Sequence, residues 1–139
     1  MREISFRGKT EDGKWVEGNY VKAYDYGHVE SIKHLIFSNS SFYGYDGYTN
    51  DEEVIIETVG QFTGLTDKNG KKIFEGDIVT GRFLHSLPIN AVVAFRNGSF
   101  GLLWDRAGVE TFDAFTSLCN IVYEVIGNIN DNPELLEVE

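Results

Sequence analysis

Hydrophobic and polar residues alternate along short stretches of this chain, with the period of two that is typical of half-buried β-strands. Near the N-terminus, Ile4, Phe6 and Gly8 alternate with polar residues, and a second strand-like stretch covers residues 15–21. Residues 11–13, with the sequence EDG, lie between the two stretches and are typical of a turn. This arrangement predicts an N-terminal β-hairpin.

Residues 29–37 fit two structures. Val29, Ile32 and Ile36 would share one face of a helix, whereas residues 32–37 also fit a strand. We predict a strand, because the neighbouring segments are rich in glycine and no capping residue precedes a helix here.

The second half of the chain shows clearer strand and turn signals. Asn97 and Gly98 give the strongest hairpin signal, because both residue types adopt the positive φ that a two-residue turn needs. Asn132 followed by Pro133 predicts the start of a short C-terminal helix. Turns are expected at residues 66–70 and 75–77, and strands at residues 58–63, 78–83, 91–95, 99–104 and 121–129, with residues 54–56 forming either a short buried strand or the entry to the next one.

These elements predict a mainly β protein made of short strands. We expect a single compact domain over residues 1–139, with two possible sub-lobes. Residues 1–57 would form N-terminal hairpins, and residues 58–139 a small β-barrel, either SH3-like or a strongly bent sheet, that ends in a short helix.

Charge and composition narrow the class of protein. The 12 basic and 22 acidic residues give a net charge of −10, which disfavours direct binding to nucleic acids and to anionic membrane surfaces. No segment approaches the ~18 consecutive apolar residues of a membrane-spanning helix, and residues 1–9 lack the apolar run of a signal peptide. Cys119 is the only cysteine, so no intrachain disulfide can form. We therefore expect a cytoplasmic protein.

Five segments occur in an order that carries a family resemblance: MREISFRGK (1–9), TVGQFTGL (58–65), DKNG (67–70), FEGDIV (74–79) and EVIGNI (124–129). Together with the tail NPELL (132–136), the set resembles the YopX family of phage and prophage proteins. Residues 22–53 and 83–118 carry little of the resemblance. It implies a phage or prophage gene expressed in a bacterial host, a β-rich fold and a family without an established activity. It supplies no catalytic residues.

His28, Glu30 and His34 are candidate metal ligands by residue type. On a strand these residues share one face, but His28 and His34 would lie roughly 20 Å apart and could not hold one ion. On a helix Glu30 and His34 would be neighbours, and a third ligand is missing. We expect no metal and no other cofactor.

Candidate catalytic groups have structural interpretations that fit better. Cys119 lies in an apolar stretch, which is typical of a buried structural thiol. Carboxylate pairs are expected by chance among so many acids, and Asp77 follows a glycine at a turn, where such a side chain usually caps backbone N–H groups. No serine-nucleophile motif and no phosphate-binding glycine loop occurs. We expect no catalytic residue and a protein that is not an enzyme.

Two surface features could contact a partner. The basic residues of one short region could meet an acidic partner or a phosphate, although a solvated turn and strand face is the commoner interpretation; they are Lys68, Lys71, Lys72 and Arg82. The better candidate is the segment 38–50, a predicted loop rich in Ser, Gly, Asn and aromatic residues, a composition typical of binding loops. Its aromatic residues are Phe42, Tyr43, Tyr45 and Tyr48.

The sequence therefore favours a non-enzymatic phage accessory protein that binds a host or phage protein. One alternative is an acidic decoy that occupies a DNA-binding protein, and another is a small hydrolase with a site assembled from distant residues. Self-association is a further expectation, since small β domains have open sheet edges.

Overall fold

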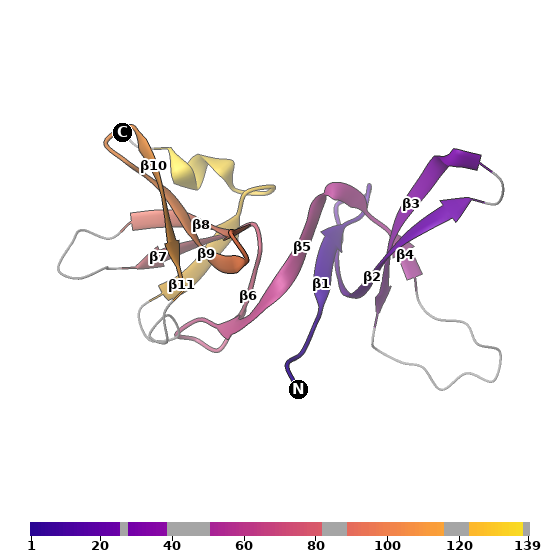
Figure 1. Ribbon diagram of the computed structural model, residues 1–139, viewed down its shortest axis with the longest axis horizontal. Helices are drawn as coiled ribbons and strands as arrows, with labels where there is room; N and C mark the ends of the chain where they lie inside the picture. The colour runs from indigo at the N-terminus through magenta and orange to yellow at the C-terminus, as the bar shows by residue number, and fades with distance from the viewer. Residues whose placement is uncertain (26–27, 39–50, 82–88, 116–122, 138–139) are drawn as a thin grey trace. The chain divides into compact units, whose positions relative to one another are not determined.

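The computed structural model describes residues 1–25, 28–38, 51–81, 89–115 and 123–137 (Figure 1). This part of the chain is almost entirely β-strand, which confirms the predicted fold class. The elements are β1 (Phe6–Lys9), β2 (Trp15–Asp25), β3 (His28–Ser38), β4 (Asp51–Glu53), β5 (Ile55–Thr66), β6 (Lys72–Phe74), β7 (Asp77–Gly81), β8 (Ile89–Arg96), β9 (Ser99–Arg106), β10 (Val109–Ala114), β11 (Tyr123–Asn128) and the 3-10 helix η1 (Pro133–Leu136).

The chain divides into two compact units, Met1–Gln61 and Phe62–Glu139. The division falls within β5, whose first part pairs with β1 and whose second part pairs with β6. The predicted N-terminal hairpin is present as β1 and β2, and the ambiguous segment 29–37 is a strand, as predicted. The single compact domain expected over residues 1–139 stays a prediction.

The first unit is built on a curled antiparallel sheet with the strand order β4-β3-β2-β1-β5. β4 and β5 lie at its two edges, yet only Val54 separates them in sequence. The edges of a flat sheet of this width would lie about 19 Å apart at ~4.8 Å per strand, whereas a single linking residue spans about 7 Å. The sheet must therefore roll up until its edges approach each other.

Close packing inside this curl explains a glycine in β1. A Cβ atom added to Gly8 would lie 2.9 Å from Cβ of Val54. Val54 and Ile36 are both buried, and the strand register places Phe6, Tyr20 and Ile36 on the same concave face. The rings of Phe6 and Tyr20 lie 5.8 Å apart. The first unit thus has a small core of its own.

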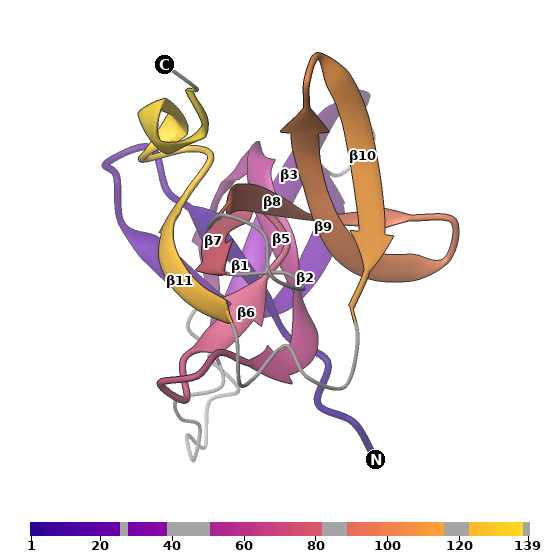
Figure 2. The same cartoon turned by 90° about the vertical axis from the view of Figure 1, so that its left-hand side faces the viewer.

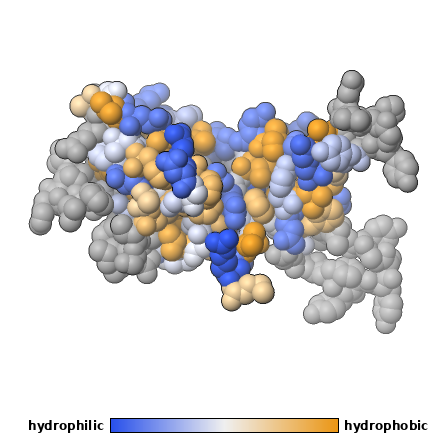
Figure 3. All heavy atoms as spheres, viewed as in Figure 1, coloured by the Kyte–Doolittle hydropathy of each residue, from blue (hydrophilic) through white to orange (hydrophobic). Residues whose placement is uncertain are grey.

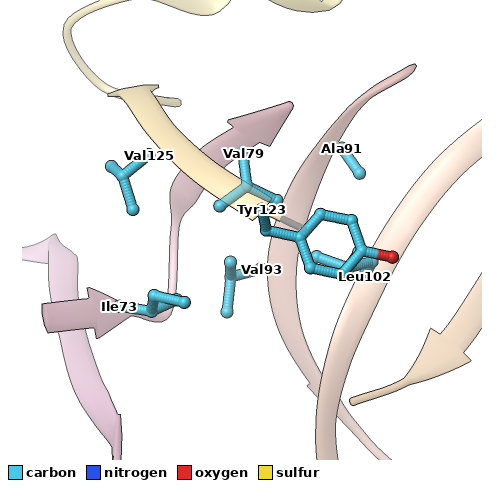
Figure 4. Close-up of a cluster of buried hydrophobic side chains, with 7 residues drawn as sticks. All are labelled: Ile73, Val79, Ala91, Val93, Leu102, Tyr123 and Val125. Atoms are coloured by element: carbon cyan, nitrogen blue, oxygen red, sulfur yellow. The ribbon is translucent and has the colours of Figure 1, made fainter. Parts of the chain in front are cut away.

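The second unit contains a five-stranded antiparallel sheet with the order β10-β9-β8-β7-β11 (Figure 2). Side chains from one face of this sheet, together with Ile73 of β6, form the main hydrophobic core (Figure 4); they are Val79, Ala91, Val93, Leu102, Tyr123 and Val125. Among the described residues the ladder ends at β10 and at β11, so the sheet is open and a closed barrel is not shown.

Two tight turns create the β8–β9–β10 meander. Asn97 (φ 52°) and Gly98 (φ 79°) form the predicted turn between β8 and β9. A second turn with the same conformation, Ala107 (φ 53°) and Gly108 (φ 82°), leads into β10 and was not predicted. It escaped sequence reasoning because alanine rarely adopts a positive φ.

The predicted C-terminal helix is a single 3-10 turn, η1, with Pro133 in its first turn. Asn132 occupies the N-cap position but makes no capping side-chain bond, and instead its Oδ1 accepts a hydrogen bond from the backbone N–H of Asn128 at 3.3 Å. The side-chain amide of Asn90 donates to the backbone carbonyl of Leu135 at 2.8 Å. This bond fixes η1 against β8.

Candidate functional site

The second sheet has an outer face, opposite the core, that carries a surface pocket. Its volume is about 270 Å³. The pocket combines an apolar floor, a side-chain amide and two carboxylates, and its lining residues are Asn90, Val92, Leu103, Trp104, Asp105, Glu110 and Leu136. It is formed by β8, β9, β10 and η1, all of which belong to the second unit.

Strand register brings the lining residues together. Val92 of β8 pairs with Leu103 of β9, and both are half-buried and form the apolar floor. Leu136 reaches the pocket from η1, which is attached to β8 through Asn90. On the core side, Nε1–H of Trp104 donates to Oδ2 of Asp113 at 2.7 Å. That bond restrains the indole that borders the pocket.

The two carboxylates of the pocket face each other across neighbouring strands, since Asp105 pairs directly with Glu110. The two-residue turn makes Arg106 and Val109 a hydrogen-bonded pair, so Asp105 and Glu110 form a non-hydrogen-bonded pair, the class in which side chains lie closest. Oδ1 of Asp105 accepts the backbone N–H of Gly108 at 2.7 Å.

This pair brings two acidic side chains to directly opposite positions of neighbouring strands. Like charges directly opposite each other destabilise a sheet. Within the part of the chain that the structure describes, neither Asp105 nor Glu110 forms an ion pair. A cation supplied from outside would relieve the repulsion, and the apolar floor would accommodate the alkyl stem of a Lys or Arg side chain.

Of the residues considered as metal ligands, His28, Glu30 and His34, the structure describes the side chain of His34 alone. No set of three or more His, Cys, Asp or Glu residues is arranged to hold an ion among the residues described. Nδ1 of His34 lies 2.5 Å from the hydroxyl of Tyr20, and the two rings are stacked. His28 and Glu30 belong to β3, but their side chains lie outside what the structure describes.

The structural role predicted for Asp77 is confirmed. Its Oδ2 accepts the backbone N–H of Phe74 at 2.7 Å in a buried position. Asp67, which sequence reasoning did not single out, has a similar role. Its carboxylate accepts the backbone N–H groups of Asn69, Lys71 and Val125, each at 2.9 Å.

The basic residues of one region make local contacts. Nζ of Lys68 lies 3.5 Å from Oε2 of Glu124, and Nζ of Lys72 lies 5.2 Å from the ring centre of Phe62. These contacts fit the interpretation of a solvated turn and strand face. Lys71 lies beside Asp67 and favours the ionised form of that carboxyl.

Several residues that the sequence singled out lie outside the described residues: Phe42, Tyr43, Tyr45, Tyr48, Arg82 and Cys119. The aromatic binding segment stays a prediction. The pocket was not predicted, since its residues come from four separate elements and form no sequence motif. The local feature that comes nearest to indicating the pocket is the segment 105–110, with the sequence DRAGVE, because it contains both carboxylates of the lining, Asp105 and Glu110.

A second exposed feature belongs to the first unit. The paired strands β2 and β3 carry apolar side chains with large exposed fractions: Val21 (41%), Tyr24 (62%) and Ile32 (38%). Hydrophobic residues also lie among hydrophilic ones over the face drawn in Figure 3. Scattered apolar exposure is common in proteins, so this feature alone does not define a site.

The fold and the pocket describe a small β-rich protein with an acidic surface pocket. Residues 5–137 match the family model described as "YopX protein", and the chain therefore belongs to the YopX family. The predicted family is thus confirmed. No curated protein matches the chain.

The chain resembles a solved structure over its full length. The crystal structure of protein EF1440 from Enterococcus faecalis is 27% identical, with a TM-score of 0.60. The match covers 99% of this chain and 100% of that one. In the described residues, no helix has the length and hydrophobicity needed to cross a membrane.

Proposed function

We propose that this YopX-family chain is a non-enzymatic protein-binding module whose pocket receives a Lys or Arg side chain of a partner protein. The observation that carries the proposal is the facing pair Asp105 and Glu110 at a pocket with an apolar floor. The carboxylates would meet the cationic group, and Val92, Leu103 and Leu136 would contact the alkyl stem.

The charge of the whole chain supports the same partner class. A net charge of −10 creates a field that attracts basic proteins and repels nucleic acids. We expect the partner to be a host or phage protein in the bacterial cytoplasm. The aromatic residues predicted in segment 38–50 would add to the same function.

Affinity purification from bacterial host cells, with and without phage, tests this proposal. The key variant is Asp105→Asn combined with Glu110→Gln, which removes both charges while keeping side-chain size. The matched control is Glu53→Gln combined with Glu57→Gln, two exposed acids of the first unit with the same change in net charge.

We expect a stoichiometric protein partner that binds the wild type and the control equally. Its affinity for the pocket variant should fall by about tenfold or more, because truncating one side of a close charge pair leaves the other unpaired. Equal binding to all three proteins, or a partner that binds only through added nucleic acid, would contradict the proposal.

A further inference from the structure

We propose that the partner segment binds as an added β-strand along the outer edge of β10, with its basic residue beside Glu110 at the β10 side of the pocket. This inference rests on the proposed function and specifies the form of its ligand. The ligand would be an extended peptide segment of another protein, held by main-chain hydrogen bonds and by alternate side chains.

The second sheet has two edge strands, β11 and β10. Another segment of the chain covers the outer edge of β11, whereas no described strand pairs with the outer edge of β10. At β11 the turn after β5 occupies the outer edge. The backbone N–H of Val125 donates to Oδ2 of Asp67 at 2.9 Å, and the backbone N–H of Lys68 donates to the carbonyl of Tyr123 at 3.0 Å. Proteins commonly protect sheet edges in such ways, because open edges are templates for pairing with another chain.

At β10 no described strand pairs with the outer edge. The backbone N–H of Phe115 donates to the carbonyl of Phe100 at 3.1 Å. With the two-residue turn at the other end, this bond fixes which residues point toward β9. The alternating residues Glu110, Phe112 and Ala114 therefore direct their N–H and C=O groups away from β9, in the direction of an incoming strand.

The side chains beside this edge set the pattern of the ligand. Glu110 and Phe112 point to the outer face, where the pocket lies, because Glu110 pairs with Asp105 and Phe112 with Leu103. Phe112 packs across Gly101, since a Cβ atom added there would lie 2.6 Å from its Cζ. A strand added to β10 would place a basic residue beside Glu110 and, two positions away, an apolar residue beside Phe112.

Charge favours a foreign peptide over a second copy of this chain. β10 has the sequence VETFDA, with two acidic residues and no basic one. Pairing β10 with itself would bring four carboxylates to the new ladder without a counter-charge. A basic peptide would neutralise Glu110 and Asp105 instead.

The test uses a displayed library of random dodecapeptides selected on the full-length chain. Enriched peptides are then synthesised, and their affinities measured for three proteins: the wild type, Glu110→Lys and Ala114→Pro. Proline at residue 114 removes one outward N–H and leaves the bonds to β9 intact, because Ala114 is exposed and does not donate to β9. Thermal unfolding confirms that both variants are folded.

We expect enriched peptides with a Lys or Arg two positions from an apolar residue. Glu110→Lys should weaken binding by about tenfold or more, and Ala114→Pro by about threefold to tenfold, the effect of one lost hydrogen bond. N-methylation of alternate peptide amides should weaken binding in the same range.

The outcomes separate the two proposals. Loss of binding in Glu110→Lys with unchanged binding in Ala114→Pro would overturn strand addition and leave the pocket function standing. No enriched peptide, or peptides insensitive to both substitutions, would overturn both. A wild-type dimer that Ala114→Pro converts to a monomer would assign the edge to a second copy and overturn the peptide proposal.

Discussion

The carboxylate of Asp67 accepts a hydrogen bond from the backbone N–H of Val125 at 2.9 Å, although the two residues lie 58 positions apart. Asp67 has only 3% of its surface exposed. Its other oxygen accepts the N–H groups of Asn69 and Lys71 and so closes the turn after β5. One side chain therefore shapes a local turn and attaches that turn to the edge of β11.

Replacing Asp67 should destabilise the fold strongly. Asp67→Ala removes the acceptor of three backbone N–H groups, and at least the N–H of Val125 is left buried. We expect a loss of about 3 kcal/mol in the free energy of unfolding, measured by urea denaturation. Glu11→Ala, at an exposed turn, should change it by less than about 0.5 kcal/mol. Similar values for the two variants would argue against the role of Asp67.

Asp67 should also make stability depend on pH. Burial opposes its ionisation and is the largest single influence, but the N–H groups of Val125, Lys71 and Asn69, with the charge of Lys71, together lower its pKa below the ordinary value of 3.8. The unfolded chain therefore takes up this proton first as the pH falls. The stabilisation is complete above pH 3.8 and is lost as the pH falls through the lowered pKa.

The comparison of wild type with Asp67→Asn isolates this effect. The difference in unfolding free energy between the two proteins should shrink as the pH falls from about 6 to about 3. A difference that stays constant over this range would show that ionisation of Asp67 does not contribute.

A side chain at position 101, where the protein has glycine, should destabilise the fold. A Cβ atom there would lie 2.4 Å from the backbone carbonyl oxygen of Asp113 and 2.6 Å from Cζ of Phe112. Gly101→Ala should lower the free energy of unfolding by about 2–3 kcal/mol, because a neighbouring strand has to shift. Gly108→Ala is the control, since it meets only the strain of a positive φ and should cost about 1 kcal/mol. The reverse order in thermal unfolding would contradict the close approach of β9 and β10.

Replacing Ala107 by glycine should stabilise the fold. Its φ of 53° is unfavourable for alanine and favourable for glycine. Ala107→Gly should therefore raise the free energy of unfolding by about 0.5–1 kcal/mol, whereas Asn97→Ala, at the matching position of the preceding turn, should lower it. Both are measured by chemical denaturation. A destabilising Ala107→Gly would contradict the turn geometry.

Local sequence patterns were sufficient to predict most of the strands and turns. The alternation around Phe6 predicted the first hairpin, and Asn97-Gly98 predicted the turn between β8 and β9. The cap formed by Asp77 followed from its place after a glycine. These features depend on backbone preferences and on contacts a few residues away, which a sequence displays directly.

The candidate site could not be predicted in the same way. Asp105 and Glu110 are close in sequence, but they lie opposite each other only because Ala107 adopts a positive φ, which its residue type does not indicate. Leu136 and Asn90 join them only through the packing of η1 on β8.

By itself, the sequence determined the β-rich class, the family and the strong negative charge, because alternation, ordered motifs and residue counts are properties of the chain alone. The tertiary structure decided the curl that Val54 imposes on the first sheet, the covering of β11 by Asp67 and the pocket beside β10. Each of these depends on which distant strands become neighbours, and long-range pairing is set by the packing of the whole unit rather than by any local pattern.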